Sequence, residues 1–224
     1  GPYIGKEVEL KSLYDVVGQI NKLYEEKGYM TCRAMLPPQT IKKGVVIIRL
    51  VEGTTGSVTI DGNKTTKAGY IKERIDLQPG QVKNIKELNK DLLLFNASND
   101  VQLRISRKAG QEKGTTDYEI KAYEPQQQVW TVYEDNAGSE STGQWRTGLF
   151  YNNRSLRGVR DNLSLGTLDS VGNKSFFANY STTLGRSGTK LALQYSTNSI
   201  KITKGEMEPL GVRGHAYAMG AGLI

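Results

Sequence analysis

The stretch QWRTGLFY, residues 144–151, decides the fold because its side chains alternate in size and polarity. An extended chain points successive side chains to opposite faces, so every second residue shares a face. One face of this stretch holds Trp145, Thr147, Leu149 and Tyr151, and the other holds Gln144, Arg146 and Gly148. The stretch is therefore predicted to be a β-strand with one apolar and one polar face.

The same alternation recurs in KLALQYS at residues 190–196 and in FFANYS at residues 176–181. No helical period is visible after Glu124-Pro125. We expect about six strands between residues 129 and 224, separated by Gly, Asn and Ser turns. Segments of about 10 residues with this pattern are typical of an antiparallel transmembrane β-barrel.

The chemistry of the two faces favours a membrane barrel over a soluble sheet. Arg146, Lys190 and Gln194 on the polar faces suit a water-filled lumen, and Tyr and Phe near the strand ends suit a lipid interface. A soluble β-sandwich shows the same alternation and remains the alternative.

The first 53 residues are predicted to form a helix followed by two strands. One helix face carries apolar residues at a spacing of three and four, namely Leu10, Leu13, Val17, Ile20 and Tyr24. The helix ends at Lys27-Gly28, because glycine readily adopts the left-handed conformation that closes a helix. Residues 31–36 and 45–51 are predicted strands, interrupted by Pro37-Pro38.

Residues 54–124 are predicted to repeat this order with a strand and a helix in front. The predicted elements are strand 57–60, helix 66–75, helix 85–95, strand 101–107 and strand 115–123. Asn84 is placed to cap the second helix, with Glu87 three positions later. Lys43-Gly44 and Lys113-Gly114 each precede a closing strand, at an offset of about 70 residues. The sequence therefore predicts an α+β module of order β-α-α-β-β present twice, the first copy lacking its opening strand and helix.

Composition argues against an enzyme and against a nucleic-acid-binding protein. The formal net charge is +7, but the basic residues form no long run and no zinc-finger or RNA-binding motif is present. A single Cys32 and a single His215 exclude an internal disulfide and a metal site built from cysteine or histidine pairs. Cys32 is interpreted as a small buried residue. We expect no catalytic residue, no metal and no cofactor.

The sequence offers no helical membrane span. No apolar run approaches the ~20 residues that such a helix needs, and the start Gly1 to Ile4 does not resemble a signal peptide. A helical membrane protein is therefore not expected, and the start of the sequence says nothing about where the whole protein resides.

The residues resemble a known family over nearly the whole chain. The match is carried by residues 20–29, 33–39 and 44–53, then by Phe95-Asn96, 100–103, 114–117, Glu124-Pro125, 135–143, Ser155 to Gly158 and Arg160-Asp161. These stretches resemble the TpsB transporters of two-partner secretion, which are the haemolysin secretion/activation proteins of the ShlB/FhaC/HecB type.

The resemblance implies a division of the chain and a function. Residues 1–53 would be a first POTRA module without its N-terminal part, residues 54–124 a second POTRA module, and residues 125–224 the first strands of an incomplete transmembrane β-barrel. The POTRA modules would lie in the periplasm and capture a partner exoprotein of the haemolysin or adhesin type in extended form. The barrel, in contact with outer-membrane lipid, would then secrete it. No cofactor and no nucleic acid is implied.

The resemblance also implies a docking site for the exoprotein. A POTRA sheet leaves one strand edge unpaired, and in the family's strand order this edge would be strand 101–107 of the second module. An unpaired edge can accept an extended chain as an added strand. The candidate binding residues are Leu88, Leu92, Phe95, Val101, Gln102, Leu103, Arg104, Ile105 and Arg107. For the inward-pointing ones core packing is the stronger interpretation, so the backbone edge with Arg104 and Arg107 carries the binding hypothesis.

Two other functions remain open at this stage. A barrel-assembly factor of the same superfamily would insert proteins into the membrane instead of exporting them, and usually carries more POTRA modules. A soluble adhesin or structural binding protein would behave as a monodisperse chain without detergent. In the transporter interpretation, the polar loop 135–143 lies outside the cell at the far end of the first hairpin.

Overall fold

The computed structural model describes residues 4–224, which divide into two compact units. The first unit comprises the chain up to Asp61 together with residues 75–95 and 103–122. The second comprises residues 62–74, 96–102 and 123–224. Within the described residues no helix is long and apolar enough to cross a membrane.

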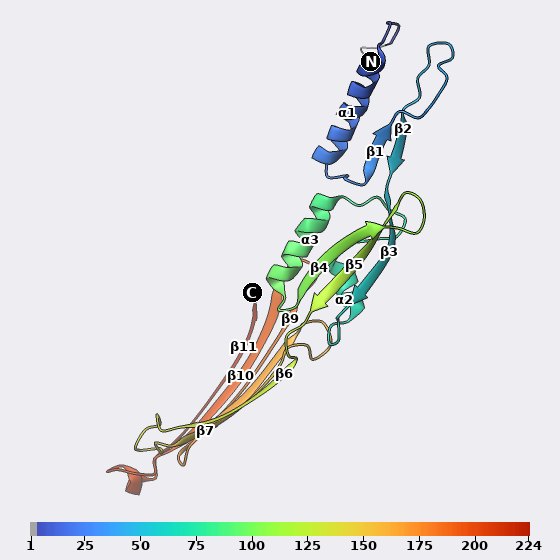
Figure 1. Ribbon diagram of the computed structural model, residues 1–224. Coiled ribbons are helices and arrows are strands. Elements are labelled where there is room, and N and C mark those ends of the chain that lie inside the picture. Colours follow the sequence, from blue (N-terminus) through green and yellow to red (C-terminus); the bar gives the residue numbers. More distant parts are fainter. Residues whose placement is uncertain (1–3) are drawn as a thin grey trace. The chain divides into compact units, whose positions relative to one another are not determined.

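The first unit begins with α1 (Leu10–Glu26), which packs along the two-stranded sheet of β1 (Cys32–Met35) and β2 (Arg49–Glu52) (Figure 1). The side chain of Asn21 in α1 holds the main chain of Ala34, accepting from its N–H at 2.7 Å and donating to its carbonyl at 3.1 Å. Cys32 and Ala34 are buried and alternate with exposed residues. The prediction that Cys32 is buried is confirmed.

The second strand is shorter than predicted, since β2 begins only at Arg49 instead of residue 45. Residues 42–45 form a tight turn in which Lys43 and Gly44 both have positive φ. Ile47 bonds to the side chain of Gln39, its N–H donating at 2.8 Å and its carbonyl accepting at 2.8 Å. Pro37-Pro38 ends β1 early, so the residues before Arg49 have no strand opposite them.

The first unit continues with β3 (Thr54–Asp61), most of α3 (Ile85–Ser98), β4 (Gln102–Ala109) and β5 (Thr115–Tyr123). The sheet order is β3-β5-β4, with β3 parallel to β5. Its core includes the buried side chains of Leu88, Phe95, Leu103, Tyr118 and Ile120. These elements lie close to the predicted ranges, because each has a clear apolar period.

Asn84 caps α3 as predicted. Its Oδ1 accepts the N–H of Lys86 at 3.0 Å and that of Glu87 at 3.4 Å. The same side chain donates to the carbonyl of Lys27 at 2.9 Å, and the N–H of Ile85 donates to the carbonyl of Gly28 at 2.9 Å. Gly28 has φ +86°, and a Cβ there would lie 2.4 Å from the Asn84 Oδ1. The end of α1 is therefore bonded directly to the start of α3.

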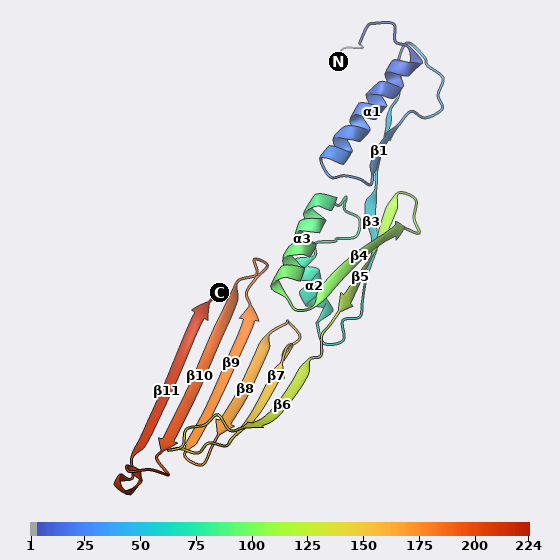
Figure 2. The same ribbon diagram turned by 60° about the vertical axis from the view of Figure 1, so that its left-hand side comes forward.

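The second unit contains α2 (Ala68–Arg74) and one six-stranded antiparallel sheet. Its strands follow each other in sequence order across the sheet (Figure 2). They are β6 (Gln128–Asp135), β7 (Arg146–Asn153), β8 (Asn162–Asp169), β9 (Asn173–Thr183), β10 (Lys190–Lys201) and β11 (Arg213–Leu223). A single-turn helix, η1 (Glu208–Leu210), lies between the last two.

The strand register confirms that the sheet has two chemically different faces. The apolar face carries large hydrophobic side chains, among them Trp130, Val132, Leu149, Tyr151, Leu165, Phe176, Tyr180, Leu191, Leu193, Tyr195, Tyr217 and Met219. The polar face includes Arg146, Asn152, Ser164, Asn179, Ser181, Lys190, Gln194 and Asn198. Val132 and Met219 are 70% and 74% exposed, so within the described chain no second layer covers them, as a β-sandwich would require.

Three aromatic rings on the polar face were not expected from its alternation. Tyr133 stacks on Phe150 with ring centroids 5.6 Å apart, and Phe150 lies 5.8 Å from Phe177. The rings cover two buried glycines: a Cβ on Gly148 would lie 2.6 Å from Tyr133, and one on Gly166 would lie 2.4 Å from Phe177. Only glycine leaves room for this row of rings against the sheet.

Candidate functional site

The strand predicted to bind the exoprotein, β4, lies at one edge of its three-stranded sheet, as expected. Leu103 is buried and Ile105 half-buried, whereas Gln102, Arg104 and Arg107 are exposed. Because alternate residues face opposite sides of a strand, Arg104 and Arg107 lie on different faces and do not form one basic patch.

The predicted residues around β4 are mostly core residues. Leu88, Phe95 and Val101 are buried, and Leu92 is half-buried. Their neighbour Leu93, which has no place in the predicted site, is 70% exposed. An added chain would therefore meet the backbone edge of β4 and outward side chains, not the buried ones.

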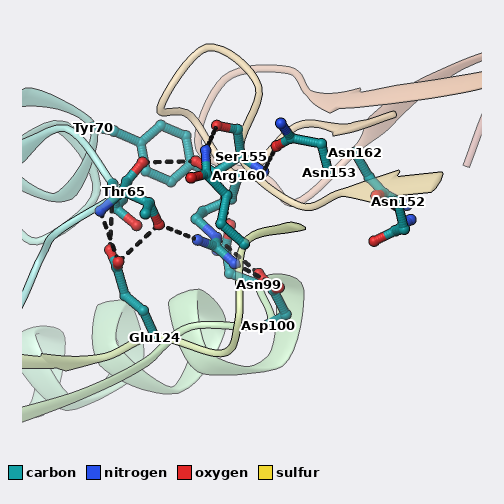
Figure 3. A network of polar contacts seen from close by, with 12 residues as sticks. Thr65, Tyr70, Asn99, Asp100, Glu124, Asn152, Asn153, Ser155, Arg160 and Asn162 are labelled. Carbon is teal, nitrogen blue, oxygen red and sulfur yellow. Dashed lines mark hydrogen bonds and ion pairs between the residues drawn. The ribbon is translucent and has the colours of Figure 1, made fainter. Parts of the chain in front are cut away.

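An extensive polar arrangement lies in the second unit (Figure 3). There the turn between β7 and β8 meets the loop before α2 and the loop after α3. We call it the polar hub, and define it by Thr65, Asp100, Glu124, Ser155 and Arg160. All five belong to the second unit. They come from four separate stretches of the chain, so the fold alone brings them together.

Arg160 is the centre of the polar hub. Its side chain is 0% exposed and forms a two-pronged ion pair with Asp100, with distances of 2.8 Å from Nε to Oδ1 and 2.5 Å from Nη2 to Oδ2. A third donor, Nη1, reaches the hydroxyl of Thr65 at 3.2 Å. The planar guanidinium suits such a fork, and a buried charge needs these partners.

Glu124 holds the loop before α2 from the other side. Its carboxylate accepts the N–H and the hydroxyl of Thr65, both at 2.7 Å, and the N–H of Thr66 at 2.8 Å. Ser155 adds a bond from its hydroxyl to the carbonyl of Thr65 at 2.8 Å. Burial raises the pKa of Glu124, but the hydrogen bonds from Thr66 and Thr65 outweigh burial and hold the pKa below its ordinary value. The carboxylate is therefore ionised at neutral pH.

The turn that carries Arg160 is closed by its neighbour Asp161, which is fully buried. Asp161 accepts the main-chain N–H of Arg157 at 3.0 Å, the Nε of Arg157 at 3.1 Å and the hydroxyl of Tyr180 at 2.8 Å. Burial raises the pKa of Asp161, but the hydrogen bonds from Arg157 and Tyr180 outweigh burial, so the pKa lies below its ordinary value.

This arrangement holds the turn between β7 and β8 and the neighbouring loops in position. Each charged side chain is satisfied by a partner within the polar hub, and no group of metal-binding side chains occurs among residues 4–224. Glu124, Arg160 and Asp161 belong to the stretches that carry the family resemblance, yet the sequence assigns them no role. For Arg160 and Asp161, the available signal was a turn with four charged residues, RSLRGVRD at 154–161, between two alternating strands.

Comparisons with known proteins agree with this architecture. Residues 1–53 match the POTRA domain of ShlB type. The heme/hemopexin transporter protein HuxB of Haemophilus influenzae is 26% identical over 226 residues, covering 99% of this chain and 40% of that protein. The outer membrane transporter CdiB of Dickeya dadantii is 23% identical, covering 79% of this chain and 30% of that protein.

Solved structures show the same fold. CdiB from Escherichia coli aligns with a TM-score of 0.59 at 21% identity, covering 96% of this chain and 40% of that one. BamA from Haemophilus ducreyi, lacking POTRA domains 1–3, aligns with a TM-score of 0.56 at 12% identity, covering 98% and 42%. This chain spans about 40% of the length of the HuxB relative.

Proposed function

We propose that the chain is a TpsB outer-membrane transporter of two-partner secretion, which recognises an exoprotein in the periplasm and passes it across the outer membrane. Outer-membrane localisation with periplasmic POTRA domains, expected from the sequence, agrees with the relatives. The transporter relatives also agree with a protein that is not an enzyme.

The observation that carries the proposal is the six-stranded sheet with two different faces. An apolar face of large, exposed side chains suits lipid, and a polar face with Arg146, Lys190 and Gln194 suits a wet lumen. We propose that residues 125–224 supply the first strands of a transmembrane barrel, and that residues 1–53 and 54–124 are two POTRA modules.

We further propose that the exoprotein docks in extended form on β4. The edge position of β4 supports this, because an edge strand presents main-chain donors and acceptors to an incoming strand. Arg104 and Arg107 would contact acidic or polar side chains on opposite sides of the added strand.

A site-specific photo-crosslinker at Ser106 in the complete transporter tests this docking. Ser106 is exposed on β4, and Thr59 is exposed on β3, the other edge of the same sheet, so Thr59 is the matched control. We expect crosslinks to the secreted partner encoded by the neighbouring gene from Ser106 and not from Thr59. Equal crosslinking from both positions would contradict docking on β4.

The alternative of a barrel-assembly factor is less well supported. The likeness to BamA is a likeness of fold at 12% identity, whereas the ShlB-type POTRA match and the HuxB and CdiB relatives favour secretion. Secretion that persists without the transporter, together with loss of other outer-membrane barrels, would favour assembly instead.

A further inference from the structure

The end of the six-stranded sheet opposite to the polar hub is formed by three loops. They are residues 136–145, 170–172 and 202–212, which join β6 to β7, β8 to β9 and β10 to β11. Consecutive antiparallel strands place these three connections at one end of the sheet (Figure 2). All three belong to the second unit.

Hydrogen bonds tie the three loops together. The N–H of Gly172 donates to the carbonyl of Thr142 at 2.6 Å, and the N–H of Thr203 donates to the carbonyl of Ser141 at 2.7 Å. The hydroxyl of Ser170 also donates to the Thr142 carbonyl, at 2.8 Å. The second and third loops are therefore both held to the first loop by hydrogen bonds of the protein itself.

The joined loops line an open cavity of about 630 Å³. This volume lies in the range of small-molecule sites. The lining side chains that bring chemistry are Glu140, Ser141, Gln144, Trp145, Thr203 and Lys204. They offer one large aromatic ring surrounded by hydroxyl, amide, carboxylate and ammonium groups.

We propose that this cavity binds a neutral sugar ring of an oligosaccharide. A sugar has apolar C–H faces and a rim of hydroxyls that both donate and accept. The indole of Trp145, which is 64% exposed, can cover the C–H face, and the surrounding acceptors and donors suit the hydroxyls.

The charges of the lining argue against a phosphate and against a divalent cation as the ligand. Glu140 and Lys204 are the charged residues of the lining and cancel, whereas a phosphate site needs cations that are not opposed by an acid. A divalent cation needs several oxygen ligands with carboxylates among them, and one carboxylate is present.

Trp145 also has the position expected of an anchor at a membrane interface, since it falls on the same side of the chain as Thr147 and Leu149. An anchoring role explains the exposed ring but not the hydrogen-bonded cavity beside it. Saturation transfer to the sugar protons distinguishes the two roles, because a membrane anchor alone would not produce it. The inference does not rest on the proposed function, because sugar binding requires no exoprotein.

The test uses the full chain in detergent micelles with maltotetraose and chitotetraose as probes, followed by saturation-transfer NMR on the sugar protons. We expect saturable transfer for at least one probe below about 10 mM, and a loss of affinity of about tenfold or more in Trp145→Ala. Trp130→Ala is the matched control, because Trp130 is 63% exposed and lies on β6 away from the cavity. Circular dichroism verifies that each variant keeps its sheet.

A second arm distinguishes a free oligosaccharide from a lipid headgroup. The Trp130→Phe chain, in which Trp145 is the remaining tryptophan, is placed in phosphatidylcholine vesicles with or without digalactosyldiacylglycerol. A shift of Trp145 emission with the glycolipid identifies a lipid-borne sugar as a ligand. The proposal is overturned if neither arm shows binding, or if Trp145→Ala and Trp130→Ala weaken sugar binding equally.

Discussion

Arg160 has a backbone conformation that is unusual for its residue type. Its φ is +55°, in the left-handed region where side chains other than glycine, asparagine and aspartate are rare. Such a conformation costs of the order of 1 kcal/mol or more and persists only where neighbouring contacts fix it. The ion pair with Asp100 and the bond to Thr65 supply those contacts, so the turn between β7 and β8 is held by its own side chains.

At this scale we predict that Asp100→Ala strongly destabilises the second unit. The variant leaves the buried Arg160 guanidinium without its carboxylate, which costs about 1–3 kcal/mol because the Asp100 side chain is itself 36% exposed and water replaces part of the lost contact. Thermal unfolding in detergent, together with amide exchange at Thr65 and Thr66, measures the loss.

The matched control for this prediction is Glu73→Ala. Glu73 pairs with Arg74 at 3.6 Å in the same unit, but its side chain is 74% exposed, so its removal is expected to cost about 1 kcal/mol or less. Adding Arg160→Met to Asp100→Ala removes the guanidinium charge that has lost its partner, and should recover part of the stability. If Asp100→Ala and Glu73→Ala unfold alike, the polar hub does not stabilise the unit.

At the scale of single elements, alternation in the sequence predicts which face of a strand a side chain lies on, but not which residues meet across neighbouring strands. Alternation was sufficient to place Leu149 on the apolar face and Arg146 and Lys190 on the polar face. Side chains in a strand point to one side at odd positions and to the other side at even positions. Alternation did not reveal that Phe150 and Phe177 occupy the polar face over Gly148 and Gly166, since that arrangement depends on the register between strands. The start of β2 was missed for a similar reason: a β-branched run forms a strand only where a partner lies opposite.

The covered glycines give a prediction for β8. Gly166→Ala would place a methyl group 2.4 Å from the Phe177 ring and should destabilise the sheet by about 1–3 kcal/mol. Gly222→Ala, on the polar face of β11, is the control because nothing lies within 4 Å of its Cβ position. Thermal unfolding of both variants compares the two costs.

A rescue variant tests the cause of this effect. Phe177→Ala in the Gly166→Ala background removes the clash and should restore part of the lost stability. Equal stability of Gly166→Ala and Gly222→Ala would mean that the rings move aside without cost.

At the scale of the whole molecule, the six-stranded sheet ends in β6 on one side and β11 on the other, and both are unpaired edges. Its apolar face exposes residues such as Trp130, Leu193 and Met219. An open edge beside an exposed apolar face promotes pairing between molecules.

We therefore predict that the chain without detergent does not behave as a 24.8 kDa monomer in light scattering. The double variant Val132→Lys and Tyr217→Lys places a charge on the apolar face of each edge strand, β6 and β11. It should shift the size distribution toward smaller species, because charge on an edge strand opposes pairing. A sharp monomer with the sheet fully protected in hydrogen exchange would mean that the apolar face is covered within the molecule.

The sequence predicted the order of elements, but not the polar hub. Helices and strands have local periods, whereas Thr65, Asp100 and Arg160 meet only after the chain has folded. The buried state of Leu88 and Leu103 was foreseeable from their periods, and the exposure of Leu93 on α3 was not.

The joint between α1 and α3 has a mechanical consequence. The bonds from Asn84 and Ile85 to Lys27 and Gly28 join the end of α1 to the start of α3, and Gly28 has no room for even a methyl group. These bonds oppose bending of the chain between α1 and α3. In the docking that we propose on β4, a bound polypeptide would therefore meet a support that bends little, so less free energy would be spent on ordering the protein.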